Sequence, residues 1–260
     1  MTTKSFRILF VALCFSCNNN ASSAKYGKIT PSQLSTSDEN PYKKISEIPL
    51  PDGFSRVLIE NNSFGSYLRN VALKTDKTVY KFNGMPKGNQ LAQFAVLNIS
   101  VGDKDLQQCA DAVMRLRAEY LFEQHRFNEI NFKDNDGKTI FTPPYNRQHF
   151  TTFLEQVFGM CGSASLAKQL NTVADFNSIH IGDVIIRGGF PGHAVQVMDI
   201  AANKDGEKIY LLAQGFMPAQ DIHVLVNDLN SDLSPWYKVD NRPIIKTPEY
   251  TFSSKELKRW

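Results

Sequence analysis

A cysteine, a histidine and a glutamine occur in a pattern that suits nucleophilic attack on a carbonyl group. Cys109 lies near the start of a segment with helical periodicity, and the positive end of a helix dipole favours the reactive thiolate. His193 begins a β-branched run, where an imidazole can accept the thiol proton and later return it to a leaving amine. Gln214 ends the following run, and a third polar group fixes which ring nitrogen faces the cysteine. We take these three residues as candidate catalytic residues.

The contact between His193 and Gln214 depends on the register of a predicted β-hairpin. Centring its turn between Asn203 and Lys204 places His193 directly opposite Gln214 and leaves apolar residues facing one another. A slip of one residue would move Gln214 to the other face of the sheet.

Each candidate also has a purely structural interpretation. Cys109 shares a helical face with Leu106, Val113 and Leu116, and a free cysteine on such a face is usually a small buried apolar group. A lone histidine or a glutamine at a strand end commonly satisfies backbone groups. A disulfide between Cys109 and Cys161, which an exported protein can form, would exclude the catalytic interpretation.

The N-terminal residues predict export and a lipid anchor. Lys4 and Arg7 precede the apolar run 8–13, which is shorter than the roughly 20 residues that span a bilayer. This pattern is typical of a secretory signal. The signal ends in a loose lipobox at Cys17, followed by a polar run, although Cys14 competes as the acceptor.

These observations divide the chain into three parts. We expect a lipoprotein signal peptide over 1–17, a polar tether over 18–45 and one globular domain over 46–260. With lipid attachment at Cys17, the protein would be extracytoplasmic and held on a bacterial membrane, which we expect to be the outer membrane.

Composition argues against nucleic acid, metal and cofactor. The chain has 29 basic and 26 acidic residues, and a net charge of +3 gives no reason to expect a nucleic-acid partner. Its five histidines are scattered, with no pair at the spacing of metal ligands. We therefore predict no metal and no cofactor.

Hydrophobic periodicity predicts strands, then helices, then more strands, which indicates the α+β class. Asp103 or Asp105 is the expected cap of the helix that carries Cys109. The helices are expected over 103–124, about 150–158 and 165–170, and the strands over 56–60, 71–74, 78–82, 91–101, 183–187, 193–200, 208–214 and 222–226.

The order of helical cysteine, Gly-Asp strand, Gly-His strand and polar residue resembles the NlpC-type cell-wall cysteine peptidases and the related CHAP amidases. The resemblance implies a papain-like core in which the cysteine helix packs on an antiparallel sheet. It also implies that Cys109 is the nucleophile, His193 the general base and Gln214 the orienting residue, with backbone N–H groups near Cys109 as oxyanion hole. The Asp-Cys-Ser-Gly of that family is Gln-Cys-Ala-Asp at 108–111 here, and residues 126–178 would be a helical insertion.

Over its full length the chain resembles domain-of-unknown-function family 4846, lipoproteins of uncharacterised function from Bacteroides-type bacteria. The residues that carry this resemblance are 105–112, 115–121, 188–194, 212–220 and 234–237. Three functions stay open: a cysteine peptidase or amidase acting on cell-wall peptides through a thioester, a non-catalytic envelope lipoprotein that binds a peptide or glycan, and a structural envelope protein.

Overall fold

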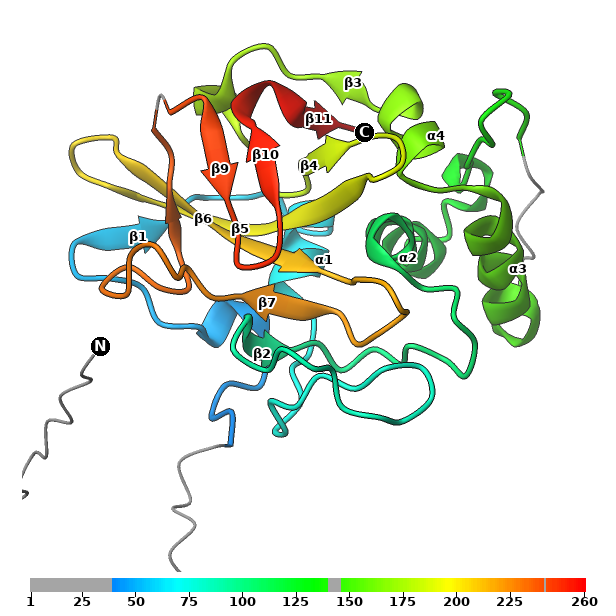
Figure 1. Ribbon diagram of the computed structural model, residues 1–260. Helices are drawn as coiled ribbons and strands as arrows, with labels where there is room; N and C mark the ends of the chain where they lie inside the picture. The colour runs from blue at the N-terminus through cyan, green and yellow to red at the C-terminus, as the bar shows by residue number, and fades with distance from the viewer. Residues whose placement is uncertain (1–38, 140–145, 241) are drawn as a thin grey trace, which may run out of the picture. The chain divides into compact units, whose positions relative to one another are not determined.

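A large antiparallel sheet forms the centre of the computed structural model, which describes residues 39–139, 146–240 and 242–260 (Figure 1). The predicted lipid site at Cys17 lies outside these residues. Within them the strand order is β2-β7-β6-β5-β4-β11-β3, with β1 paired to β5 and β8 to β6, and β9 and β10 form a separate two-stranded sheet. The strands are β1 Phe54–Arg56, β2 Gln93–Val96, β3 Asn171–Thr172, β4 Val184–Arg187, β5 His193–Asn203, β6 Lys208–Gln214, β7 His223–Leu225, β8 Tyr237–Lys238, β9 Ile244–Lys246, β10 Thr251–Ser253 and β11 Leu257–Arg259.

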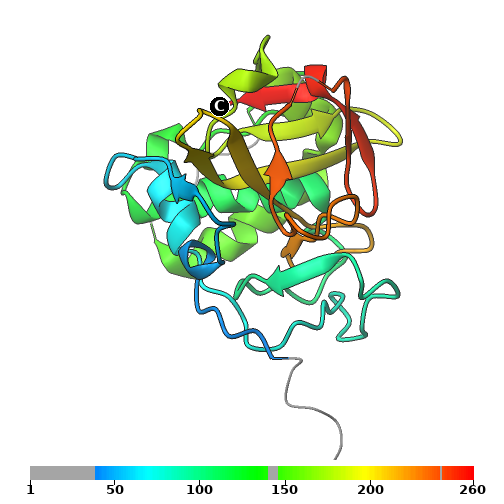
Figure 2. The same cartoon turned by 90° about the vertical axis from the view of Figure 1, so that its left-hand side faces the viewer.

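Helices cover one face of the large sheet, and the β9–β10 hairpin covers the other (Figures 1 and 2). Ala194 and Met198 of β5 pack in the helical core, whereas Val195 and Val197 pack against the hairpin side. The central strands read as continuous apolar runs because both of their faces are buried. The helices are α1 Phe64–Asn70, α2 Cys109–Glu123, α3 Arg147–Met160 and α4 Ser163–Gln169, and short 3₁₀ turns cover Ile45–Glu47, Phe127–Glu129, Phe176–Ser178 and Ser254–Glu256.

The predicted α+β class is confirmed, but several predicted elements of the first half of the domain differ from the structure, and β3 and β8 to β11 were not predicted. Residues 71–74 and 78–82 form only isolated bridges, and the strand expected over 91–101 is limited to β2. Helix α1 was not predicted, because its seven residues are too few to show a clear period. Within the described ranges, no helix has the length and apolar character needed to cross a membrane.

Helix α2 begins at Cys109, not at the predicted cap Asp103 or Asp105. The carboxylate of Asp111 accepts a hydrogen bond from the Gln108 N–H at 3.0 Å, which closes the first turn in the manner of a capping box. Asp105 instead accepts a 2.6 Å hydrogen bond from the N–H of Ala219, far away in the chain. The cysteine is therefore the first residue of the helix, where backbone N–H groups have no partner within the helix.

The turn between β5 and β6 is centred on Asp205, later in the chain than predicted. The N–H of Asn203 donates to the carbonyl of Glu207 at 3.0 Å, and the Asn203 side chain accepts from the N–H groups of Asp205 and Glu207. The predicted register, which placed His193 directly opposite Gln214, is therefore wrong. An asparagine side chain inside the turn has determined the centre of the hairpin.

A β-bulge nevertheless brings the same two side chains to one face of the sheet. The pairing shifts by one residue between Val197 and Asp199, so Met198 is the extra residue on β5. A one-residue shift reverses the facing of every side chain beyond it. Without the bulge, His193 and Gln214 would point to opposite faces; with it, they are diagonal neighbours.

Asp199 anchors the far end of β5 to the helical layer. Its carboxylate is fully buried and binds Nε of Arg56 at 2.7 Å and Nε of Arg69 at 2.6 Å. It does not face Lys208, as the predicted register required. One buried carboxylate therefore compensates two guanidinium groups from separate segments.

We expect Asp199→Ala to lower the free energy of unfolding by about 3 kcal/mol, because both guanidinium groups would lose their buried partner. Urea unfolding at neutral pH measures this change. Asp205→Ala, at an exposed turn position, should change stability by less than about 0.5 kcal/mol. Equal effects of the two substitutions would contradict the assignment.

Candidate active site

Cys109 and His193 line one cavity of about 570 Å³ at the beginning of β5. Cys109 is half-buried at the start of α2, and His193 is the buried first residue of β5. The segments 158–164 and 189–192 complete the wall. Cys109 and His193 therefore line the same cavity.

Glycine is required immediately before the histidine. A Cβ atom on Gly192 would collide with the side-chain oxygen of Ser163 and with the carbonyl oxygen of Gly189. The chain can therefore enter β5 next to the start of α4 only without a side chain at this position. This close approach explains the Gly-His pair in the sequence.

Nε2 of His193 and Oε1 of Gln214 lie 2.7 Å apart, and both side chains are almost fully buried. Around the imidazole, the ring centroids of Phe216 and Tyr250 lie 4.9 Å away and that of Phe252 lies 5.8 Å away. The aromatic rings exclude water from this side of the imidazole. The amide of Gln214 is therefore its main polar partner within the described residues.

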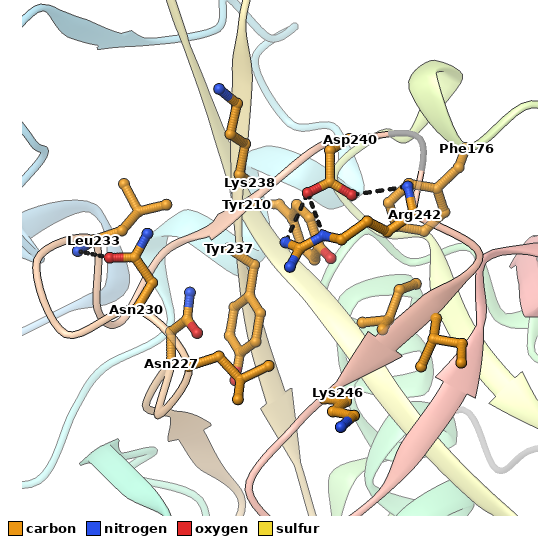
Figure 3. Close-up of a pocket in the computed structure, with 13 residues that line it drawn as sticks. Phe176, Tyr210, Asn227, Asn230, Leu233, Tyr237, Lys238, Asp240, Arg242 and Lys246 are labelled. Atoms are coloured by element: carbon orange, nitrogen blue, oxygen red, sulfur yellow. Dashed lines mark hydrogen bonds and ion pairs between the residues drawn. The ribbon is translucent and has the colours of Figure 1, made fainter.

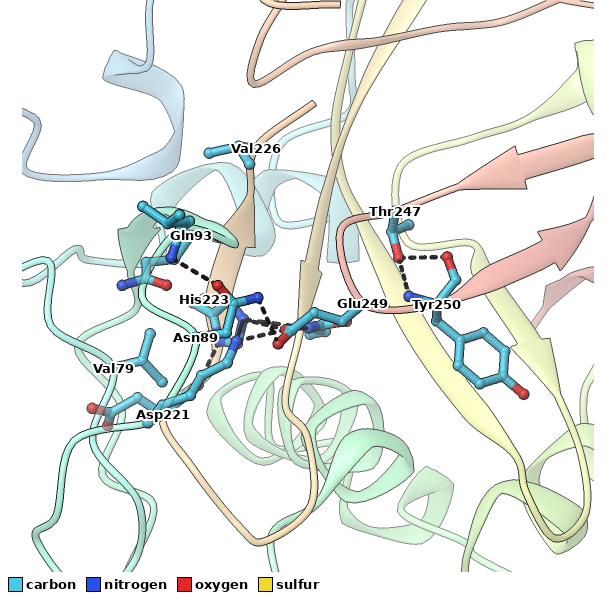
Figure 4. Close-up of polar contacts among 12 residues, drawn as sticks. Val79, Asn89, Gln93, Asp221, His223, Val226, Thr247, Glu249 and Tyr250 are labelled. Carbon is cyan, nitrogen blue, oxygen red and sulfur yellow. Dashed lines mark hydrogen bonds and ion pairs between the residues drawn. The ribbon is translucent and has the colours of Figure 1, made fainter. Parts of the chain in front are cut away.

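Glu249, in the turn between β9 and β10, fixes the orientation of the Gln214 amide. Nε2 of Gln214 donates to Oε2 of Glu249 at 2.7 Å and lies 3.4 Å from Nε2 of His223. Figure 4 shows Glu249 pointing from that turn toward His223 on β7. Burial alone would raise the pKa of Glu249, but the hydrogen bond and positive charge of Lys87 outweigh burial and lower it. Glu249 is therefore an ionised acceptor, which only the NH₂ end of the amide can face.

Lys87 and His223 complete this buried cluster. Nζ of Lys87 donates to Oε2 of Glu249 at 2.6 Å and lies 3.4 Å from Nε2 of His223. Nδ1 of His223 lies 2.9 Å from the carbonyl oxygen of Asp221 and must carry the proton there, which leaves Nε2 as an acceptor. Sequence reasoning missed Lys87, His223 and Glu249, since they lie in a loop, a short strand and a turn with no shared motif.

This network determines the tautomer of His193. The amide nitrogen of Gln214 faces Glu249 and His223, so the amide oxygen faces the imidazole and accepts its Nε2–H. A neutral imidazole that is protonated at Nε2 has its lone pair at Nδ1. Nδ1 is therefore the nitrogen of His193 that can accept a proton.

The electrostatics of the thiol differ from the expectation of an activated thiolate. Burial raises the pKa of the Cys109 thiol to about 11, and the nearby carboxylate of Asp111 adds to the rise. The backbone N–H groups of Ala194, Ala110 and Cys109 lower this pKa, but by less than burial raises it. Burial likewise lowers the pKa of His193 to about 4. The resting pair is thus a neutral thiol and a neutral imidazole, since burial disfavours both charged forms.

Cys109 and Cys161 are both free thiols, so the disulfide that would exclude Cys109 as a candidate nucleophile is not formed. Cys161 lines the same cavity, and its Sγ lies 3.3 Å from the carbonyl oxygen of Lys133. Asp111 raises the pKa of both thiols, which places its carboxyl group near the two sulfurs.

A second, smaller cavity carries no comparable chemistry. It lies beside β8 and β9, has a volume of about 130 Å³ and is lined by residues that include Tyr237, Asp240 and Arg242 (Figure 3). Nε of Arg242 donates to Asp240 at 2.7 Å, so these two charged groups pair with each other. Among the described residues, neither a cysteine nor a histidine lines this cavity. The described residues also contain no group of three or more His, Cys, Asp or Glu side chains that could hold a metal ion.

Comparison with known proteins gives a family but no activity. A family model described as "Domain of unknown function (4846)" matches residues 45–142 and 139–259. No curated protein and no solved structure matches the chain.

We expect alkylation of Cys109 by iodoacetamide to accelerate with pH up to at least about pH 10, with no plateau near neutrality. With a pKa of about 11, only about one thiol in ten thousand is ionised at pH 7. Peptide mapping by mass spectrometry gives the rate at each cysteine separately, and Cys161 serves as internal reference because burial also raises its pKa to about 11. A Cys109 rate that levels off below about pH 8 would show a preformed thiolate and contradict the neutral resting pair.

Proposed function

The chain belongs to the domain of unknown function (4846) family, and we propose that it is a papain-like cysteine hydrolase that cleaves an amide bond through a thioester on Cys109. The geometry that supports the proposal is the oriented His193, whose Nε2–H is accepted by Gln214 and whose Nδ1 is left unprotonated, together with the cavity that His193 and Cys109 both line. The cysteine helix packed on an antiparallel sheet agrees with the resemblance to NlpC-type peptidases.

In the first step, Sγ of Cys109 attacks the carbonyl carbon of the substrate while the thiol proton moves to Nδ1 of His193. This concerted transfer suits a neutral pair, because a buried thiolate does not have to form beforehand. The backbone N–H groups of Cys109, Ala110 and Ala194 face the sulfur and are the candidate donors to the oxyanion. The intermediate then expels the amine, which takes the proton from His193 and leaves a thioester on Cys109.

In the second step, water attacks the thioester carbonyl and gives a proton to Nδ1 of His193. The intermediate collapses to release the carboxylic acid, and the proton returns to Sγ of Cys109. Gln214 keeps its hydrogen bond to Nε2–H throughout and stabilises the imidazolium that forms in each step. Atoms and charge balance as the hydrolysis of one amide by one water molecule.

The proposed cellular setting is based on the N-terminal sequence. We propose that the protein is exported, that Cys17 carries the lipid anchor, and that the domain acts in the cell envelope, where cell-wall peptides are the available amides.

We expect p-nitrophenyl acetate, an activated acyl donor, to give a burst of p-nitrophenol and an acetyl group on Cys109. Cys109→Ala should abolish the burst, and His193→Ala should slow it by roughly 100-fold or more. Cys161→Ala is the matched control and should keep the burst. Mass spectrometry of the quenched protein locates the acetyl group.

Acetyl groups distributed over lysines, or a burst that survives in Cys109→Ala, would overturn the hydrolase proposal. The non-catalytic alternative, an envelope lipoprotein that binds a peptide or glycan, would then be preferred. Circular dichroism of each variant shows whether a lost burst reflects unfolding.

Removing the charge of Glu249 should slow acylation although this group does not contact the cavity of Cys109. In Glu249→Gln, the Gln214 amide is no longer forced to present its oxygen to His193, so we expect a burst about tenfold slower. Glu207→Gln is the control. It removes an exposed carboxylate that pairs with Lys238 near the turn between β5 and β6, and it should leave the burst unchanged. Equal rates in the two variants would show that Glu249 does not act through the imidazole.

A further inference from the structure

The cavity beside Cys109 also constrains what can bind there. We infer that this cavity receives an uncharged peptide segment with an apolar side chain and disfavours segments that carry a carboxylate. The inference rests on the proposed hydrolase function. This conclusion rests on the charges of the cavity wall, on three exposed apolar side chains and on one unpartnered buried oxygen.

The wall of the cavity offers no positive charge to a substrate carboxylate. Its lining among the described residues includes neither lysine nor arginine, and its acidic members are Asp105 and Asp111. Burial raises the pKa of Asp111 to about 8, so this carboxyl group is mostly ionised only above that pH. Burial lowers the pKa of His193 to about 4, so this side chain is uncharged near neutral pH. A carboxylate entering the cavity would lose hydration without gaining a partner, which is costly in a desolvated site.

Apolar side chains surround the cavity and stand open to solvent. Phe190 is 96% exposed, Met217 63% and Met160 50%, and they come from three separate segments: the loop before β5, the chain after β6 and the end of α3. Such large apolar side chains gathered at one cavity are typical of a binding site. Flexible methionines adapt to side chains of different shape, which suits an apolar segment.

Asp111 supplies a place for a hydrogen-bond donor. The residue is 5% exposed, and its Oδ2 accepts from the N–H of Gln108, whereas Oδ1 is buried without a hydrogen-bond partner among the described residues. Buried polar atoms are normally paired, so an unpartnered oxygen on a residue that lines the cavity points to a donor that arrives with the ligand. A backbone N–H of a bound peptide is a neutral donor that leaves the apolar contacts intact.

Three alkylating probes of Cys109 test this preference without a known substrate. Iodoacetate carries a carboxylate, iodoacetamide is neutral, and N-benzyliodoacetamide is neutral and apolar with an N–H group. Rates at about pH 8.5, read at Cys109 by peptide mapping, are divided by the rates with free cysteine to remove intrinsic reactivity. We expect N-benzyliodoacetamide to react at least about tenfold faster than iodoacetate on this normalised scale.

Two variants assign the preference to its causes. Phe190→Ser should reduce the advantage of N-benzyliodoacetamide over iodoacetamide severalfold, whereas Leu229→Ser, which alters an exposed leucine outside this cavity, should leave it unchanged. Asp111→Asn keeps an acceptor oxygen and the cap of α2, and should raise the rate of iodoacetate relative to that of iodoacetamide severalfold; this ratio removes the effect of Asp111 on the pKa of Cys109.

The outcomes separate this inference from the proposed function. Equal normalised rates for the three probes, with a p-nitrophenyl acetate burst that still requires Cys109 and His193, would overturn the substrate preference and leave the hydrolase standing. A faster reaction with iodoacetate would also overturn the preference. A Cys109 that resists all three probes and gives no burst would remove both.

Discussion

The hydrogen bond between Nε2 of His193 and Oε1 of Gln214 is the contact on which the candidate site depends. It exists because a bulge at Met198 shifts the register of β5 against β6 and so turns both side chains to the same face. It has a direction because ionised Glu249 holds the other end of the Gln214 amide. Strand register and one buried carboxylate thus determine which nitrogen of an imidazole can act as a base.

Burial gives this site its chemical character. The aromatic surroundings and the packed sheet keep His193 neutral, and the start of α2 keeps Cys109 a thiol, although the helix dipole acts in the opposite direction. A neutral pair requires that charge separation occur only when a carbonyl group is present. The ionic groups Lys87 and Glu249 lie behind Gln214, so the cavity itself stays largely apolar.

Local residue types were sufficient to predict the α+β class, the main helices and the three central strands of the second half. They also gave Cys109, His193 and Gln214 as candidates, because each lies at the end of a segment with clear periodicity. The register between His193 and Gln214 depended on the turn and on a bulge, which residue types do not reveal. Glu249 could not be predicted, since its role comes from packing between segments far apart in the chain, and the pKa of Cys109 depends on burial that only the fold defines.

The ¹⁵N chemical shifts of the His193 ring show directly which ring nitrogen carries the proton, because they distinguish a protonated ring nitrogen from one with a free lone pair. In the resting protein at neutral pH, we predict a neutral ring with the proton on Nε2 and an unprotonated Nδ1. A ring protonated at Nδ1 and free at Nε2 would contradict the account, because the nitrogen assigned as the base would then already carry a proton.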